Sequence, residues 1–190
     1  SQCWLKENLN VGVMIPGEEW MANNDTVEKY CFADQSDTCY KYGGLYQWNE
    51  MMQYNAVQGT QGICPDGWHI PTDEEYKILE GTVDGHYNVG DEEWDRLAYR
   101  GTNVAERLKC INNWSAGGSG NNIYGFSALP GGYHHSSGNF LKIGYLVDFW
   151  SSTEYDANRA WYRKMHSNED KIERSNLGKG FGFSVRCIRD

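Results

Sequence analysis

The polar and apolar positions of residues 71–81 follow the period of an amphipathic helix. Thr72 can accept a hydrogen bond from the free backbone amides at the start of this helix, and Glu75 completes a capping box. The apolar residues that recur on one face are Tyr76, Leu79 and Val83. The pattern predicts a helix whose acidic residues stabilise its amino-terminal end and take no part in catalysis.

Two shorter stretches also show helical spacing. Residues 44–53 carry an apolar stripe, which consists of Leu45, Trp48, Met51 and Met52. Residues 103–109 place Val104 and Leu108 on one face. We expect a second helix and a third, short helix at these positions.

Beyond Cys110 the helical spacing ends, and short apolar pieces alternate with Gly, Ser and Asn. Residues 114–122 are typical of a loop. The predicted strands are residues 126–133, 140–143, 149–152, 160–166, 171–174 and 183–188. This order predicts an α+β fold with two or three helices early and short antiparallel strands with long loops late. Because no repeat or linker divides the chain, residues 1–190 are expected to form one domain.

The net charge of -9 narrows the partners that the chain can have. No cluster of Lys and Arg is present, which disfavours nucleic acid and acidic membrane surfaces. No apolar run approaches the roughly 20 residues needed to cross a bilayer, so we expect no membrane insertion. The 8 Trp and 13 Tyr outnumber the 6 Phe, and rings with polar groups suit both an irregular core and a binding surface.

Six cysteines without a Cys-x-x-Cys pair favour disulfides over a metal site. A polar turn separates Cys31 from Cys39, and one bridge could close it. The sequence does not fix the connectivity, but the bridges we expect are Cys31 with Cys39, Cys64 with Cys187, and Cys3 with Cys110. Such a disulfide-braced domain belongs outside the cytoplasm, whereas the alternative is six buried thiols in a reducing cytoplasm.

Six short phrases lie in order over nearly the whole chain. They are residues 4–10, 31–39 with 41–46, 64–72, 124–132, 149–154 and 182–187. They include Cys-Pro-Asp-Gly-Trp-His at 64–69 and Gly-Phe-Ser-Val-Arg-Cys at 182–187. Together these phrases resemble the Fibrobacter succinogenes major paralogous domain family.

The resemblance implies a bacterial protein that is secreted or held at the cell surface, often as a lipoprotein, with no established reaction. It also implies a C-type-lectin-like fold, similar to that of formylglycine-generating enzymes and of variable proteins diversified by retroelements. In those variable proteins the stretch before the closing phrase displays the residues that contact the ligand. Residues 155–180 occupy that place in this chain.

The candidate binding residues come from this stretch and from the turn around residue 134. Alternate side chains of a strand share a face, so Tyr162, Lys164 and His166 are expected to be displayed opposite Arg163 and Met165. The predicted binding residues are Tyr133, His134, His135, Tyr155, Asn158, Tyr162, Lys164, His166, Asn168, Glu169, Lys171 and Glu173. The alternative is a solvated charged face that has no partner.

Catalysis is not expected from these residues. An oxidase of the formylglycine-generating type needs two redox-active thiols near its C-terminus, and only Cys187 lies there. No Gly-x-Ser-x-Gly motif singles out a nucleophile. His134 and His135 point to opposite faces of a strand, so they are not expected to share a metal. Loop carboxylates that could hold calcium are Asp34, Asp37, Asp156 and Asp170, but the sugar-binding triplets of calcium-dependent lectins are missing. We expect no metal and no cofactor.

The sequence therefore favours a non-catalytic recognition or adhesion module that binds a protein or glycan of unknown identity. Such a module could be part of a larger surface protein. One alternative is a carbohydrate-binding module that stacks its aromatic rings on plant polysaccharide. Two others are an oxidase-like enzyme and a structural spacer or self-assembly unit.

Overall fold

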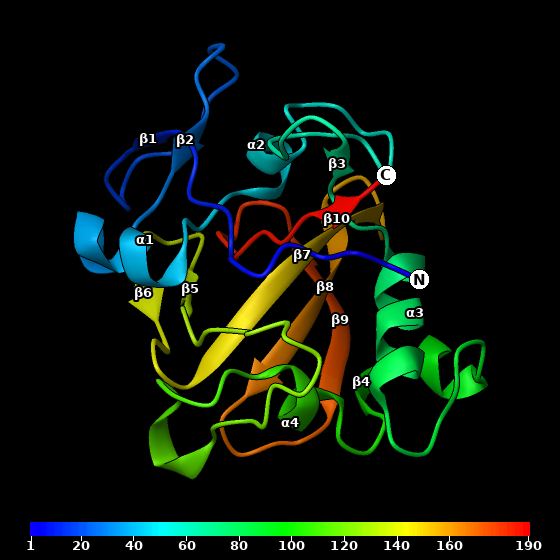
Figure 1. Ribbon diagram of the computed structural model, residues 1–190. Helices are drawn as coiled ribbons and strands as arrows, with labels where there is room; N and C mark the ends of the chain where they lie inside the picture. Colours follow the sequence, from blue (N-terminus) through cyan, green and yellow to red (C-terminus); the bar gives the residue numbers. More distant parts are fainter.

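An antiparallel sheet of four strands lies at the centre of the computed structural model, which describes residues 1–190 (Figure 1). The strand order is β4 (Ala98–Arg100), β9 (Ile172–Gly178), β8 (Arg159–His166) and β7 (Leu146–Glu154). Three two-stranded pairs surround it: β1 (Val13–Met14) with β2 (Glu28–Lys29), β3 (Trp68–His69) with β10 (Ile188–Arg189), and β5 (Tyr133–His134) with β6 (Phe140–Leu141). The β1–β2 pair is parallel, and the other two are antiparallel. The α+β class is confirmed.

Two of the predicted helices are confirmed. Helix α3 (Asp73–Val83) begins after Thr72, whose side chain accepts from the Glu75 amide while the Glu75 carboxylate accepts from the Thr72 amide. Helix α4 (Val104–Leu108) lies inside the predicted range, with Val104 and Leu108 fully buried. In Figure 1, α3 runs beside the sheet.

The helix expected over residues 44–53 is much shorter, because its first residues join other segments as bridges. Leu45 bridges Tyr30, and Tyr46 bridges Phe183, so α2 covers only Trp48–Met51. The predicted stripe is nevertheless buried. Helix α1 (Ser36–Tyr42) was not predicted: Cys39 is its only buried residue, so no apolar face marks it in the sequence. Short 3-10 turns occur at Phe32–Asp34, Glu92–Asp95 and Ser115–Gly117.

The predicted strands 149–152 and 160–166 lie inside β7 and β8, and 140–143 and 171–174 overlap β6 and β9. The strand expected at 126–133 is wrong except for Tyr133. Ser127 has a left-handed backbone (φ 56°), and Ala128 makes only an isolated bridge to Lys109. Residues 183–188 form isolated bridges with three separate segments, and only Ile188 belongs to a strand. Apolar runs can be buried without joining a ladder, which explains both errors.

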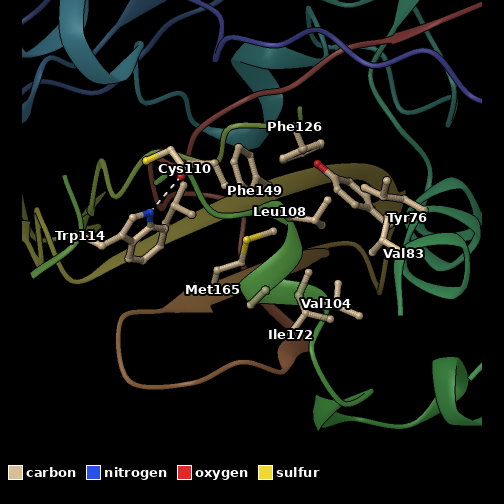
Figure 2. Close-up of a cluster of buried hydrophobic side chains, with 14 of the residues drawn as sticks. Tyr76, Val83, Val104, Leu108, Cys110, Trp114, Phe126, Phe149, Met165 and Ile172 are labelled. Carbon is tan, nitrogen blue, oxygen red and sulfur yellow. Dashed lines mark hydrogen bonds between the residues drawn. The ribbon is translucent and has the colours of Figure 1, made fainter. Parts of the chain in front are cut away.

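Hydrophobic cores lie on both faces of the sheet, which is why residues 146–152 of β7 are buried throughout. The core beneath α3 and α4 contains Tyr76, Leu108, Phe126, Phe149 and Met165 (Figure 2). The core on the opposite face is built from residues such as Tyr46, Trp48, Trp150, Tyr162 and Phe183.

Buried ion pairs attach α3 to the sheet. Asp73 accepts from Arg163 of β8 and Arg174 of β9, each at 2.7 Å. Glu80 accepts from Arg163 and from Arg100 of β4, each at 2.5 Å. The carboxylates of the capped helix therefore bind the sheet, in agreement with their expected structural role.

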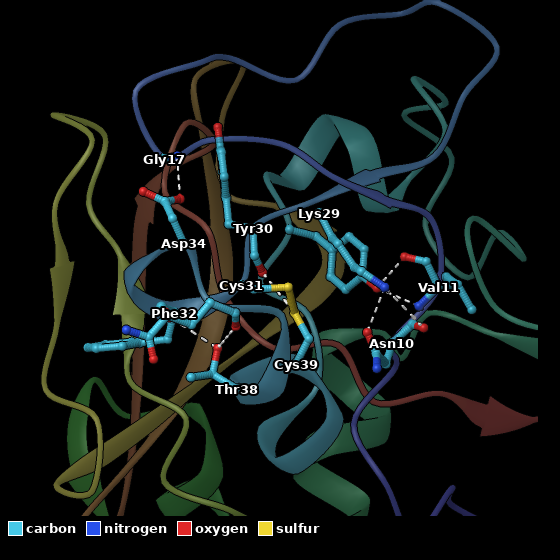
Figure 3. Close-up of a disulfide and its surroundings, with 12 residues drawn as sticks. Asn10, Val11, Gly17, Lys29, Tyr30, Cys31, Phe32, Asp34, Thr38 and Cys39 are labelled. Atoms are coloured by element: carbon cyan, nitrogen blue, oxygen red, sulfur yellow. Dashed lines mark hydrogen bonds between the residues drawn. A yellow bond between two sulfur atoms is a disulfide. The ribbon is translucent and has the colours of Figure 1, made fainter.

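Two of the three expected disulfides are present, Cys31–Cys39 and Cys64–Cys187. Figure 3 shows the first, which joins the turn after β2 to α1. The expected Cys3–Cys110 bridge is wrong, because both thiols are free. Cys3 is exposed, and its carbonyl accepts a hydrogen bond from the Arg189 amide. Cys110 is buried in the core shown in Figure 2, and its thiol donates to the Asn112 carbonyl. No helix is long and apolar enough to cross a membrane.

Candidate functional site

The predicted binding residues do not form one patch. Tyr155 and Asn158 lie in the turn between β7 and β8, whereas Asn168, Glu169 and Lys171 lie in the turn between β8 and β9. The eight residues of β8 separate the two turns by about 25 Å. A small ligand therefore cannot contact both turns. His166, the last residue of β8, lies at the second of them.

At the first turn, Tyr155 lies edge-on against Trp161, with 5.0 Å between ring centroids. Arg159 lies over the Tyr155 ring at 4.5 Å and pairs with Asp156 at 2.6 Å. Arg174 stacks on Trp161 at 3.6 Å. Because Arg174 covers the Trp161 ring, this cluster offers mainly Tyr155 to a ligand.

The middle of the sheet does bring predicted residues together, on the face opposite α3. Pairing across the strands places Lys164 beside Glu173, and Glu173 beside Tyr99 of β4. Lys164 Nζ lies 3.6 Å from the Glu173 carboxylate and 3.3 Å from the Tyr162 hydroxyl. Tyr162 itself is only 4% exposed, so it supports this face from within and was wrongly expected to be displayed.

Aromatic side chains extend this face toward β5. Phe181 lies 6.4 Å from Tyr133 and 4.8 Å from His135, between ring centroids. All three rings are partly exposed. Sequence reasoning missed Phe181 and Tyr99, because their places follow from loop contacts and strand register. We call Tyr99, Tyr133, His135, Lys164, Glu173 and Phe181 the display face.

His134 was expected to contact ligand, and the structure corrects this. Its side chain is 2% exposed, stacks on Tyr30 at 3.8 Å and donates from Nε2 to the Gly17 carbonyl at 2.8 Å. Burial lowers the pKa of His134. The ring therefore holds two segments together inside the protein, while the neighbouring His135 faces outward.

A buried carboxyl lies at the centre of the display face. Asp148 of β7 pairs with Lys164 in the sheet, and its Oδ1 has no hydrogen-bond partner. Burial raises the pKa of Asp148 to about 7, although Lys164 opposes the change. Asp148 also contributes to raising the pKa of Lys164, although burial of the lysine acts in the opposite direction. Near neutral pH this carboxyl is thus close to half protonated.

Asp148 makes stability depend on pH. Well below pH 4 the carboxyl is protonated in both the folded and the unfolded chain. As pH rises toward 7 only the unfolded chain ionises, so the free energy of unfolding falls, and it levels off above the folded pKa. The free energy of unfolding of Asp148→Asn, relative to that of the native chain, is therefore expected to rise by up to about 4 kcal/mol between pH 4 and pH 8. Urea unfolding at both pH values measures this gain, and an equal difference at both would contradict it.

The largest cavity lies elsewhere, between α3 and the first residues of the chain. Its volume is about 520 Å³. Its lining includes Trp4, Leu79, Leu108 and Phe126, and it contains no His, Cys, Lys or carboxylate. The hydroxyl groups that line it belong to Ser1, Thr82 and Tyr124. Separately, no group of three or more His, Cys, Asp and Glu residues gathers in the arrangement of a metal site.

Comparison with known proteins identifies one matching family model. Residues 1–189 match the model of the Fibrobacter succinogenes major domain. No curated protein and no solved structure matches the chain.

Proposed function

We propose that this chain, which belongs to the Fibrobacter succinogenes major domain family, is a non-catalytic recognition module that binds a protein or glycan through its display face. The observation that carries the proposal is the collection of partly exposed rings and charges on β4, β5, β8 and β9. Aromatic rings enclosed by polar groups are typical of binding surfaces.

A rigid backbone supports this proposal. The Cys64–Cys187 disulfide holds the segment that follows Phe181, and buried Arg163 and Arg174 hold the strands that carry Lys164 and Glu173. A face fixed in this way loses little conformational entropy when a ligand binds.

The state of the cysteines supports a role without catalysis and outside the cytoplasm. Cys187 is bound in a disulfide, so a pair of reactive thiols near the C-terminus is not available for oxidase chemistry. The free thiols of Cys3 and Cys110 belong to separate segments, one exposed and one buried. Two disulfides are typical of proteins in oxidising compartments, which favours secretion or display at the cell surface. A central antiparallel sheet with long loops is also compatible with the C-type-lectin-like fold that the family resemblance implies.

The test is a double substitution on the display face. Tyr99→Ala with Glu173→Ala is expected to weaken binding about tenfold or more, because a few interface residues, tyrosines often among them, carry most of the affinity. The probes are an array of neutral, uronic and sulfated oligosaccharides and a phage-displayed peptide library.

The matched control removes the same residue types elsewhere. Tyr40 and Glu92 are exposed and lie outside the display face, so Tyr40→Ala with Glu92→Ala is expected to change affinity less than about twofold. Equal affinities for the two double variants, or no binding of any probe by the native chain, would contradict the proposal.

A further inference from the structure

Trp20 stands apart from the other seven tryptophans of the chain. It is 62% exposed, whereas each of the others is buried or partly buried. A single exposed apolar residue needs no explanation by itself. However, the segments around this indole are packed and hydrogen-bonded in a way that positions the ring.

The indole of Trp20 lies on the backbone of Gly180. A Cβ added at Gly180 would lie 2.8 Å from Cζ3 of the indole and 3.8 Å from Cβ of Ser136. The backbone conformation at Gly180 does not require glycine, because its φ lies outside the left-handed region. The glycine therefore leaves room for the ring, and the ring lies beside the hairpin that carries His135 and Ser136.

Buried hydrogen bonds hold the three segments that meet at this ring. His134 Nε2 donates to the Gly17 carbonyl at 2.8 Å, and the backbones of His134 and Gly182 exchange two bonds of 2.9 Å. The Tyr30 hydroxyl donates to the Glu19 carbonyl at 2.7 Å (Tyr30, Gly17 and Asp34 appear in Figure 3). Gln47 Nε2 donates to the Tyr30 hydroxyl at 3.1 Å and to the Gly180 carbonyl at 3.3 Å. The backbone segments that surround Trp20 are thus held in place before any ligand arrives.

Free polar groups lie on the hairpin beside the ring. The Ser137 amide donates to His135 Nδ1 at 3.1 Å, so Nδ1 accepts and the ring proton is on Nε2. Neither His135 Nε2 nor the Ser136 hydroxyl has a partner within the chain. An indole face next to free donors matches a pyranose ring, which presents C–H groups on its face and hydroxyls at its edge.

The same segments disfavour other partners. Residues 17–22, 135–139 and 178–181 contain no exposed Leu, Ile, Val or Met, so they lack the contiguous apolar area of a protein interface. Glu18 and Glu19 are exposed next to Trp20, and the nearby Lys179 is paired with Glu154. This charge distribution repels anionic ligands, including uronic and sulfated sugars.

We propose that Trp20, His135, Ser136, Gly180 and Phe181 form a subsite for one pyranose ring of a neutral glycan, and we call it the glycan platform. The platform rests on the proposed function and narrows it, because it names the ligand class and adds Trp20 to the display face. Trp20 supplies the stacking surface, and Gly180 positions the indole.

The test uses the folded chain and the oligosaccharide array, with affinities measured in solution for neutral oligosaccharides up to about 5 mM. Binding is expected to shift the fluorescence of Trp20 toward the blue. Trp20→Ala is expected to lose affinity about tenfold or more, whereas Tyr40→Ala, which removes another exposed ring, retains it within about twofold. Gly180→Ala keeps the indole but displaces it, so a similar loss is expected. Gly178→Ala is the matched control, because its added Cβ meets only Phe181, at 4.0 Å.

Three outcomes would overturn the platform: no neutral oligosaccharide binds, only anionic ones bind, or Trp20→Ala binds as the native chain does. If peptides or anionic sugars bind and the Tyr99→Ala, Glu173→Ala variant loses them while Trp20→Ala does not, the proposed function stands and the platform fails. If no probe of any class binds, both fail.

Discussion

Replacing Glu80 by Gln is expected to lower the free energy of unfolding by about 3–5 kcal/mol. Glu80 is fully buried and accepts from Arg100 and Arg163. The neutral amide would leave three buried guanidinium groups, of Arg100, Arg163 and Arg174, facing the single carboxylate of Asp73. Arg100 is the most vulnerable of them, since its Nε already lacks a partner and burial lowers its pKa. An uncompensated buried charge is costly because the protein interior solvates it poorly.

Urea unfolding at pH 7 measures this loss. The control is Glu92→Gln, which changes an exposed glutamate in the turn before β4 and is expected to act within about 0.5 kcal/mol. A loss for Glu80→Gln as small as that of the control would show that the ion pairs do not hold α3 to the sheet.

Removing the Cys64–Cys187 disulfide with Cys64→Ala and Cys187→Ala is expected to cost about 5 kcal/mol. The two cysteines are 123 residues apart, and in the chain-entropy model a bridge that closes so long a loop restricts the unfolded chain strongly. The Cys31–Cys39 bridge spans only 8 residues, so Cys31→Ala with Cys39→Ala is expected to cost about half as much.

Thermal and urea unfolding of both double variants, compared with Cys3→Ala, check these values. Cys3 is free and exposed, so its substitution is expected to change stability little. Equal losses for the two disulfides would contradict the loop-length explanation.

The sequence predicted what depends on neighbouring residues. The capping box of Thr72 and Glu75 and the face of Tyr76, Leu79 and Val83 are local, and α3 has both. Alternation along residues 160–166 likewise predicted β8, because long strands keep a period of two. The prediction that one face of β8 is displayed was partly wrong. Phe183 and Trp150, which lie outside β8, cover Tyr162.

What the sequence did not predict depends on distant contacts. Cys3 and Cys110 were paired because they remained after the other four cysteines, and that argument contains no geometry. Trp20 was missed because its indole lies against Gly180, which is 160 residues later in the chain. Glu173 was predicted, but its neighbour Tyr99 follows only from the register of β4 on β9.

The central claim is that ligand binds where the display face meets Trp20. Its most direct test is an NMR titration of the ¹⁵N-labelled chain with the neutral oligosaccharide that binds best on the array. We expect the largest shifts at the Trp20 indole N–H and at the amides of His135, Ser136 and Phe181, with smaller shifts along β8 and β9. Shifts centred instead on Trp4, Leu79 and Phe126, around the cavity beside α3, would contradict the account.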